Sequence, residues 1–378
     1  MTALNPPVTP FDRVNAAILR VSEDGLAGFH DDPFGEIARR AGLPVGEVIE
    51  RVKAMLQAGT IRRVRQTLQA TRLAAGALVA WRLPESSLDA AFDYMVERDP
   101  FSGHVVIRST DAATPGHDYR LWTTLKVPQG YSLARHCRYL AAMTGAHDFR
   151  AMPAKRLFVL GVGHLRRSGI EPGVRAPEPA PALTTDPVRL TPLQWDVIAA
   201  LKGEFGASEI VRDIWLSRAE SAGVPLGVFL RTAREIEAMG LMGRFSTFLE
   251  HVKPLSTGER VTRYNALFHW AVPAGCELVA GGEIGRHEVL THAYWREAGP
   301  AFANVNLMAV AHGQDKQRLL DHKLAIDAHL SSIDIPVHYT NVFWGGRSEI
   351  KPSEVLPAAY ADWCRREGID PEDMREDE

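Results

Sequence analysis

The sequence predicts an α+β protein formed by tandem duplication, in which each copy joins a winged helix-turn-helix to a ferredoxin-like domain. Two observations support this fold class. The chain aligns with itself, and each copy shows two helical patterns followed by the order strand, helix, strand, strand, helix, strand. The chain also has 378 residues, which suits several domains of about 100 to 200 residues better than a single one.

The internal repeat is clearest in two segments. Residues 41–64, AGLPVGEVIERVKAMLQAGTIRRV, align without a gap to residues 222–245, AGVPLGVFLRTAREIEAMGLMGRF. Further along, LVAWRLP aligns to LFHWAVP, and His104 aligns to His292. We therefore expect both copies to form the same structural unit.

The first part of each copy, residues 11–70 and 191–250, is predicted to be a winged helix-turn-helix. In copy one, apolar residues recur at helical spacing on both sides of a Gly-x-Pro turn, and residues 61–68 follow as a wing strand. The second helix of each copy carries a mixed set of charged residues, Glu47, Glu50, Arg51 and Lys53, then Arg231, Arg234 and Glu235. Because binding to DNA phosphates requires clustered Lys and Arg, we do not expect DNA binding.

The second part of each copy, residues 76–165 and 263–350, is predicted to be ferredoxin-like. Strand and helix patterns alternate there in the order of a split βαβ fold. The elements of copy one are residues 77–83, 88–98, 104–109, 119–127, 133–144 and 149–162, and those of copy two are residues 264–272, 277–287, 290–296, 305–311, 316–330 and 337–344. A Pro/Ala-rich, extended linker, residues 166–190, separates the copies, and residues 351–378 form a C-terminal helix and tail.

The composition points to a cytoplasmic protein. A net charge of -3 gives no general attraction for nucleic acid, and three widely spaced cysteines without a CxxC pair are typical of a reducing compartment. The N-terminus lacks signal-peptide features and no run of about 18 apolar residues occurs, so we expect neither secretion nor a membrane span. The motifs GxGxxG, GxxxxGK[ST], GxSxG and HExxH are absent, which removes support for nucleotide, serine-hydrolase and zinc sites.

Two predicted strands place functional side chains on one face. Side chains alternate along a strand, so His104 and Arg108 project together in copy one, as do His292, Tyr294 and Arg296 in copy two. Both helices of a ferredoxin-like domain cover one face of its sheet, so two such sheets packed on their open faces would enclose these residues. We expect five further residues to line or flank this pocket: His117, Tyr119, Trp122, Asn304 and Asn306.

Plainer interpretations also exist for these residues. Arg and His on an open sheet face can simply be solvated, although their matched spacing in both copies makes this less attractive. His269, next to Trp270 on an apolar strand, is more typical of a core residue than of a ligand.

Several motifs resemble those of a known family. They are AGTIRRV, LVAWRLP, GHVVIR, DYRLWTTL, MPAKRLFVL and THAYWRE. From about Phe11 to about Trp344 they resemble the Lrp/AsnC-type regulators, whose effector domain is ferredoxin-like, and more specifically the siroheme decarboxylases of heme d1 and alternative heme biosynthesis. The chain would be a fused two-copy form. It departs from the family pattern at residues 339–346, YTNVFWGG, where basic residues are expected.

This resemblance implies a carbon-carbon lyase that removes carboxylate from the acetate side chains of siroheme, without oxidation, to give didecarboxysiroheme. It implies an iron tetrapyrrole as substrate or ligand, with no separate cofactor, and a homodimer or a related Lrp-like subunit as protein partner. The residues suited to grip substrate carboxylates are Arg108, Arg296, Lys155 and Arg156. His104 and His292 can divide two roles, proton donor and axial ligand of the tetrapyrrole iron.

Two alternatives share the same sequence features. One is an Lrp/AsnC-type, ligand-responsive transcription regulator. The other is a heme- or tetrapyrrole-binding protein without catalysis, which the altered run at residues 339–346 makes plausible.

Overall fold

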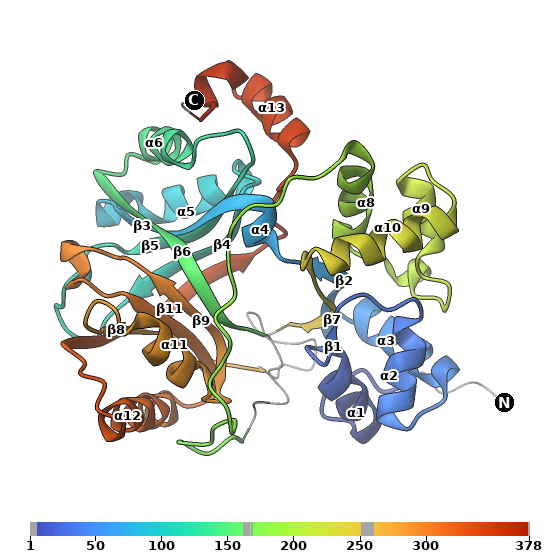
Figure 1. Ribbon diagram of the computed structural model, residues 1–378, viewed down its shortest axis with the longest axis horizontal. Helices are drawn as coiled ribbons and strands as arrows, with labels where there is room; N and C mark the ends of the chain where they lie inside the picture. Colours follow the sequence, from blue (N-terminus) through green and yellow to red (C-terminus); the bar gives the residue numbers. More distant parts are fainter. Residues whose placement is uncertain (1–5, 162–166, 168, 251–260, 377–378) are drawn as a thin grey trace. The chain divides into compact units, whose positions relative to one another are not determined.

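The computed structural model describes residues 6–161, 167, 169–250 and 261–376 and consists of two compact units (Figure 1). Unit 1 comprises Met1–Gln69, Val162–Ser168 and Arg189–Arg263, and unit 2 comprises Ala70–Gly161, Gly169–Val188 and Tyr264–Glu378. Each unit therefore takes one part from both copies of the repeat. Parts of the predicted segments lie outside the described residues, namely residues 162–165 of the first ferredoxin-like domain, 166 and 168 of the linker, and 377–378 of the tail.

Unit 1 contains the helical segments of both copies. In chain order its main helices are α1 (Arg13–Ser22), α2 (Pro33–Ala41), α3 (Val45–Gln57), α8 (Pro192–Lys202), α9 (Leu216–Ser221) and α10 (Leu226–Ala238), and its strands are β1 (Leu26–Ala27), β2 (Ile61–Leu68) and β7 (Met242–Leu249). The Asp32 side chain caps α2 by accepting from the Gly35 amide, and Gly42 ends it with a φ of 68°. The strands form one sheet in the order β1-β7-β2, so the predicted wing strands of the two copies pair with each other.

Unit 2 contains two βαββαβ segments, as the sequence predicts. The first has β3 (Ala74–Arg82), α5 (Leu88–Glu97), β4 (Ser102–Ser109), β5 (Leu121–Pro128), α6 (Leu133–Thr144) and β6 (Asp148–Leu160), preceded by α4 (Ala70–Leu73). The second has β8 (Tyr264–Ala271), α11 (Glu277–Gly285), β9 (Leu290–Arg296), β10 (Leu307–Gly313), α12 (Lys316–Ser332) and β11 (Tyr339–Ile350), followed by α13 (Pro357–Arg366).

The eight strands of unit 2 close into a barrel in the order β10-β8-β11-β4-β5-β3-β6-β9. The two sheets enclose an interior, as expected, but they are also joined at both edges, where β11 pairs with β4 and β6 pairs with β9. This pairing satisfies backbone groups that open sheet edges would leave exposed. Because β4 and β9 are four strands apart in the ring, their inward side chains face each other across the interior.

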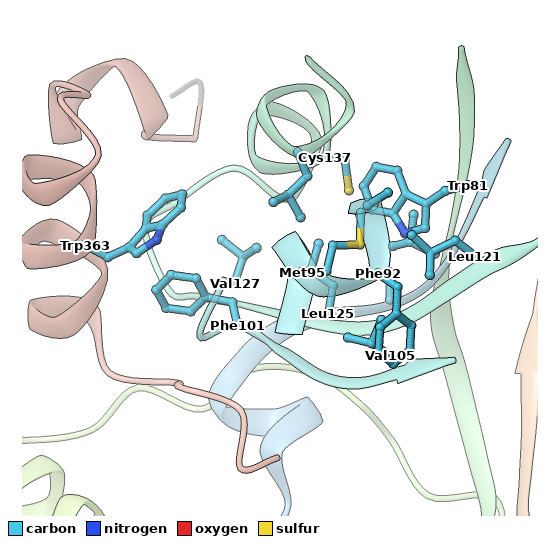
Figure 2. Packing of buried hydrophobic residues seen from close by; sticks show 14 of the residues in the cluster. Trp81, Phe92, Met95, Phe101, Val105, Leu121, Leu125, Val127, Cys137 and Trp363 are labelled. Carbon is cyan, nitrogen blue, oxygen red and sulfur yellow. The ribbon is translucent and has the colours of Figure 1, made fainter. Parts of the chain in front are cut away.

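Three clusters of buried apolar residues stabilise the barrel, two on its outer faces and one inside it. Outside the first sheet, α5, α6 and α13 cover a cluster that includes Trp81, Phe101 and Trp363, which Figure 2 shows. Outside the second sheet, α11 and α12 cover a cluster around Phe268 and Trp270. A third cluster lies inside the barrel and contains Val106, Tyr119, Trp122, Met152, Leu267, Phe302, Met308 and Phe343. The last cluster identifies the inward face of every strand except β9. On β9, Ala293 and Trp295 pack in the outer cluster, so the alternate residues face inward.

The described part of the linker in unit 2, residues 169–188, forms no helix or strand and follows the barrel wall. The Ala176 amide donates to the Arg286 carbonyl at 2.8 Å, the Ala180 amide donates to the Gly282 carbonyl at 3.0 Å, and Leu183 bridges to Leu157. These contacts fix an extended path of the kind that its composition predicts.

Among the described residues, every helix is too short or too polar to cross a lipid bilayer. Cys137, Cys276 and Cys364 carry free thiols, and the first and last of them are buried.

Candidate functional site

The inward face of β4 carries His104 and Arg108, and the inward face of β9 carries His292, Tyr294 and Arg296. Val106 lies between the first two in the alternation and belongs to the interior cluster, which fixes their direction. The strand pattern therefore brings all five predicted residues to the barrel interior, on two opposite walls.

Arg296 is almost completely buried, with 5% of its surface exposed. Its Nη1 donates to the Met152 carbonyl at 2.5 Å, and its guanidinium lies 4.4 Å from the centre of the Tyr294 ring. Burial lowers the pKa of Arg296 and raises that of Tyr294. The pair thus presents a desolvated cation beside a neutral phenol.

Arg108 is the counterpart of Arg296 on the opposite wall and is 3% exposed. Its Nη1 donates to Asn265 Oδ1 at 3.2 Å and to the Phe343 carbonyl at 3.5 Å, while its Nε is buried without a partner in the described structure. Burial lowers the pKa of Arg108 to about 9. Such a guanidinium gains from any acceptor that reaches it.

The two histidines are partly buried and anchored by hydroxyl groups. One ring nitrogen of His104, Nε2, lies 2.8 Å from Ser348 Oγ, and His292 Nδ1 lies 3.0 Å from Thr291 Oγ1. The His292 ring stacks on Tyr294 with centroids 6.1 Å apart. Each imidazole is therefore held in a defined orientation by a hydrogen bond at one ring nitrogen.

Tyr119 and Trp122, which the sequence places at the predicted pocket, lie in the apolar cluster of the interior. The Tyr119 hydroxyl donates to Asp148 Oδ2 at 2.6 Å, and burial, together with this bond, raises the pKa of Tyr119 to about 12. Trp122 Nε1 donates to the Tyr119 carbonyl at 2.6 Å, and both rings pack on Phe302. Their polar atoms are already satisfied, so they supply shape rather than charge.

Five other residues of the predicted set take different positions. Lys155 is exposed, pairs with Glu297 at 2.9 Å and lies over the Trp295 ring, and Arg156 donates to the Lys155 carbonyl. His117 and Asn304 are exposed between strands. Asn306 is buried, but its amide is bonded to the backbone N and O of Val272, both at 2.9 Å. An ion pair holds Lys155 at the surface, hydrogen bonds to the backbone hold Arg156 and Asn306, and His117 and Asn304 are exposed. We leave these five residues out of the proposed site.

The interior also contains polar residues that sequence reasoning missed: Lys126 on β5, Asn265 on β8 and His312 on β10. The alternation that points Trp122 inward also points Lys126 inward, so the signal was present in the strand pattern. Each of the three forms part of a cross-strand pair whose partner also faces inward.

His269 is a core residue, as its apolar surroundings indicate. It is 1% exposed and packs on Phe343 and Trp122. Burial, followed by the nearby charge of Arg108, lowers the pKa of His269 to about 3, so this imidazole is neutral.

The charges of the interior are unbalanced. Arg108, Lys126 and Arg296 form no ion pair with a carboxylate of the described residues. Buried cations without counterions are costly and favour an anionic ligand, in particular one with several carboxylates. No group of three or more His, Cys, Asp or Glu in the described part of the chain could hold a metal ion by itself.

Comparison with known proteins points to one family. The model of the AsnC-like ligand binding domain matches residues 73–158. A siroheme decarboxylase of Hydrogenobacter thermophilus is 23% identical over 304 residues, covering 79% of this chain and 84% of that protein. The siroheme decarboxylase NirDL subunit of Paracoccus denitrificans is 23% identical over 317 residues, covering 78% and 86%.

A solved structure supports the same relationship at the level of the fold. The siroheme decarboxylase NirDL in complex with an iron-uroporphyrin III analogue superposes with a TM-score of 0.63 at 18% identity, covering 94% of this chain and 98% of that one. Sequence matches over more than three quarters of the chain, together with a shared fold over nearly its whole length, show that this protein is similar to the siroheme decarboxylases.

Proposed function

We propose that this chain is a siroheme decarboxylase that removes carboxylate from acetate side chains of siroheme, without oxidation, to give didecarboxysiroheme in heme d1 or alternative heme biosynthesis. The observation that carries the proposal is the interior of the barrel. Arg108, Lys126 and Arg296 project there without carboxylate partners among the described residues, in a chain homologous to siroheme decarboxylases. A substrate rich in carboxylates supplies the missing anions.

Binding of the substrate would use these cations and the apolar cluster together. The arginines donate charge-assisted hydrogen bonds to carboxylates, while Trp122, Phe302 and Phe343 offer flat, apolar surface to a conjugated ring. Exclusion of water by this cluster strengthens each charge interaction and destabilises the localised charge of an ionised acetate relative to the transition state, in which the charge spreads into the conjugated ring. The iron belongs to the substrate, so the proposed reaction uses no separate cofactor.

The chemical step breaks the bond between the acetate methylene carbon and its carboxylate carbon. Carbon dioxide leaves, and the electron pair stays on the methylene carbon, where the conjugated ring delocalises it. Proton transfer to that carbon then gives a methyl group. A histidine titrates near neutrality and is suited to donate this proton.

His104 and His292 lie on opposite walls of the interior, which supports dividing two roles between them. One imidazole can coordinate the substrate iron while the other delivers the proton. Tyr294, stacked on His292 and beside Arg296, would position the substrate edge on that wall.

For unit 1 we propose a winged helix-turn-helix that no longer serves to bind DNA. A tight turn at Gly42 joins α2 to α3, and β2 follows, which supports the fold. However, Arg51 of α3 pairs with Asp12 at 2.9 Å, and β2 is paired with β7 rather than projecting as a free wing. These contacts neutralise the charge and occupy the strand that phosphate binding would require.

Fusion of the two copies supports activity without a second subunit. Strands of both copies alternate around one closed barrel, so both walls of the proposed site belong to the same chain. A second copy of the chain or a related Lrp-like subunit could still bind, but the proposed site does not need residues from it.

The test is anaerobic incubation of the purified protein with siroheme, with mass spectrometry for the loss of one or two carbon dioxide units. The wild type is expected to show this loss, and His104→Ala and His292→Ala are the variants compared. Loss that fails in either variant supports decarboxylation and identifies an essential imidazole. Tight binding with unchanged mass in the wild type contradicts the enzyme and leaves a carrier or sensor.

A further inference from the structure

The two walls of the barrel interior are related by the sequence repeat, residue by residue. Leu78 on β3 pairs with Thr124 on β5, and its counterpart Leu267 on β8 pairs with Val310 on β10. Two residues earlier, Gly76 pairs with Lys126 in copy one, and Asn265 pairs with His312 in copy two. The two cross-strand pairs therefore occupy equivalent positions and differ in chemistry.

The two buried arginines are equivalent in the same way. Arg108 on β4 lies opposite Gly345 of β11 and donates to the Phe343 carbonyl. Arg296 on β9 lies opposite Ala154 of β6 and donates to the Met152 carbonyl. Each arginine thus donates to the carbonyl of the residue two positions before its cross-strand partner. Arg108 lies next to the pair of Asn265 and His312, and Arg296 lies near the pair of Gly76 and Lys126.

In the half of the interior around Arg108, the polar side chains are hydrogen-bonded to one another. Asn265 Oδ1 accepts from Arg108 Nη1 at 3.2 Å, and Asn265 Nδ2 lies 3.1 Å from His312 Nε2. The amide of Asn265 therefore bridges the two groups. We refer to Arg108, Asn265 and His312 as the bridged half.

The half around Arg296 lacks this bridge. Glycine stands at position 76, and a Cβ built there would lie 2.8 Å from Lys126 Nζ, so the ammonium group occupies the space that a side chain would take. Within the described part of the chain, Lys126 forms no hydrogen bond or ion pair, and the residue is half-buried. We refer to Gly76, Lys126 and Arg296 as the open half.

The open half places two like charges near each other without a counterion. Burial, followed by the charge of Arg296, lowers the pKa of Lys126 to about 7. One carboxylate between the two cations would neutralise the repulsion and satisfy donors on both sides. In the bridged half, a carboxylate would have to displace the Asn265 amide from Arg108 first.

We propose that the open half, through Lys126 and Arg296, binds a carboxylate side chain of the tetrapyrrole, whereas the bridged half has lost this role. This inference rests on the proposed function, because it states which half of the proposed substrate-binding interior binds a carboxylate of the substrate. It also assigns Lys126 a role in substrate binding.

The test titrates iron uroporphyrin III into the purified full chain and follows the visible absorption of the porphyrin. Lys126→Gln removes the charge, Gly76→Asn introduces the bridging amide of the other half, and His312→Gln is the matched control at the position equivalent to Lys126. Loss of a charge-assisted hydrogen bond predicts at least about tenfold weaker binding for the first two variants and a change within about twofold for the control. Circular dichroism of each variant confirms folding, and Lys126→Arg, which keeps the charge, should retain most of the affinity.

The outcomes separate this inference from the proposed function. Equal weakening by His312→Gln and Lys126→Gln, unchanged binding by Lys126→Gln, or no binding by the wild type would each overturn the assignment of the open half. Selective weakening together with siroheme of unchanged mass would support the assignment and reject decarboxylation. Loss of carbon dioxide that is insensitive to Lys126→Gln and Gly76→Asn would support decarboxylation and reject the assignment.

Discussion

The imidazole Nε2 of His136 lies 3.3 Å from Asp99 Oδ1, and both side chains are completely buried. His136 Nδ1 is 2.8 Å from the Tyr360 hydroxyl of α13, and Lys351 donates to the backbone carbonyl of Asp99. This polar network links α6, the segment before β4 and the C-terminal helix inside an otherwise apolar cluster. It lies on the outer face of the first sheet and has no part in the proposed reaction.

We expect Asp99→Asn to destabilise unit 2. Burial would raise the pKa of the Asp99 carboxyl, but His136, the nearby Ser102 hydroxyl and the hydrogen bond from the Phe101 amide outweigh it and hold the pKa below its usual value. Removal of one member of a buried pair costs about 3 to 5 kcal/mol. Because the folded pKa is depressed, the contribution of Asp99 is present above the unfolded pKa of the carboxyl and is lost as the pH falls through the folded one.

Urea unfolding at pH 7 and at low pH measures this difference. Asp362→Ala on α13 is the control, because its ion pair with Arg365 is exposed and should contribute less than about 1 kcal/mol. Equal stability of wild type and Asp99→Asn at pH 7 would show that the buried pair contributes nothing.

Trp363→Ala should detach the C-terminal helix from the first sheet. The indole is 2% exposed and packs edge-on against Phe101 with centroids 5.3 Å apart (Figure 2). Its Nε1 also donates to the Arg98 carbonyl at 3.1 Å. Truncation of a buried aromatic costs about 3 to 5 kcal/mol, so we expect a lower midpoint of thermal unfolding and faster amide exchange in α13. Unchanged exchange in α13 would mean that other contacts hold the helix.

The sequence predicts those parts of the fold that are determined by neighbouring residues in the chain, and it does not predict pairing between distant segments. The range of α6, Leu133–Thr144, is predicted correctly because Ser132 caps the helix and Gly145 ends it with a φ of 72°. The joining of the sheets has no such signal, since the pairing of Trp344 with Ser109 connects residues of different copies. Backbone pairing at sheet edges carries little side-chain information, and the barrel therefore emerges only in the structure.

The candidate site shows the same limit. Strand alternation correctly directs Arg108 and Arg296 to a shared interior, whereas their roles stay predictions. Lys155 is attractive in the sequence as a basic residue next to a family-like motif, but Glu297 and Trp295 hold it at the outer surface. Strand alternation places Lys126 on the same face as Trp122, but a single lysine in an apolar strand indicates no role until its neighbours across the sheet are known.

Lys126→Met should stabilise the protein in a pH-dependent manner. The pKa of Lys126 is about 7 in the folded state, well below that of a lysine in the unfolded chain. At pH values between these two pKa values, Lys126 is therefore protonated in the unfolded chain and mostly neutral in the folded one. The charge thus destabilises the fold below pH 7, and this penalty disappears as the pH rises toward the unfolded pKa. Each pKa unit of displacement corresponds to about 1.4 kcal/mol. The variant should be more stable than wild type at pH 6 and similar at pH 10 in urea unfolding, and a constant difference would contradict the lowered pKa.

The affinity for iron uroporphyrin III should depend on pH through the same group. A bound carboxylate favours the charged form of Lys126, so the wild type should lose affinity as the pH rises from about 7, by up to about tenfold per unit. The neighbouring strand β4 presents His104, and β9, farther around the barrel, presents Arg296 and Tyr294; the phenol stays neutral because burial raises its pKa. Lys126→Arg keeps its charge over this range, and its affinity should stay nearly constant from pH 7 to pH 9. Parallel pH dependence in both proteins would assign the effect to another group, with His104→Ala as the next variant to compare.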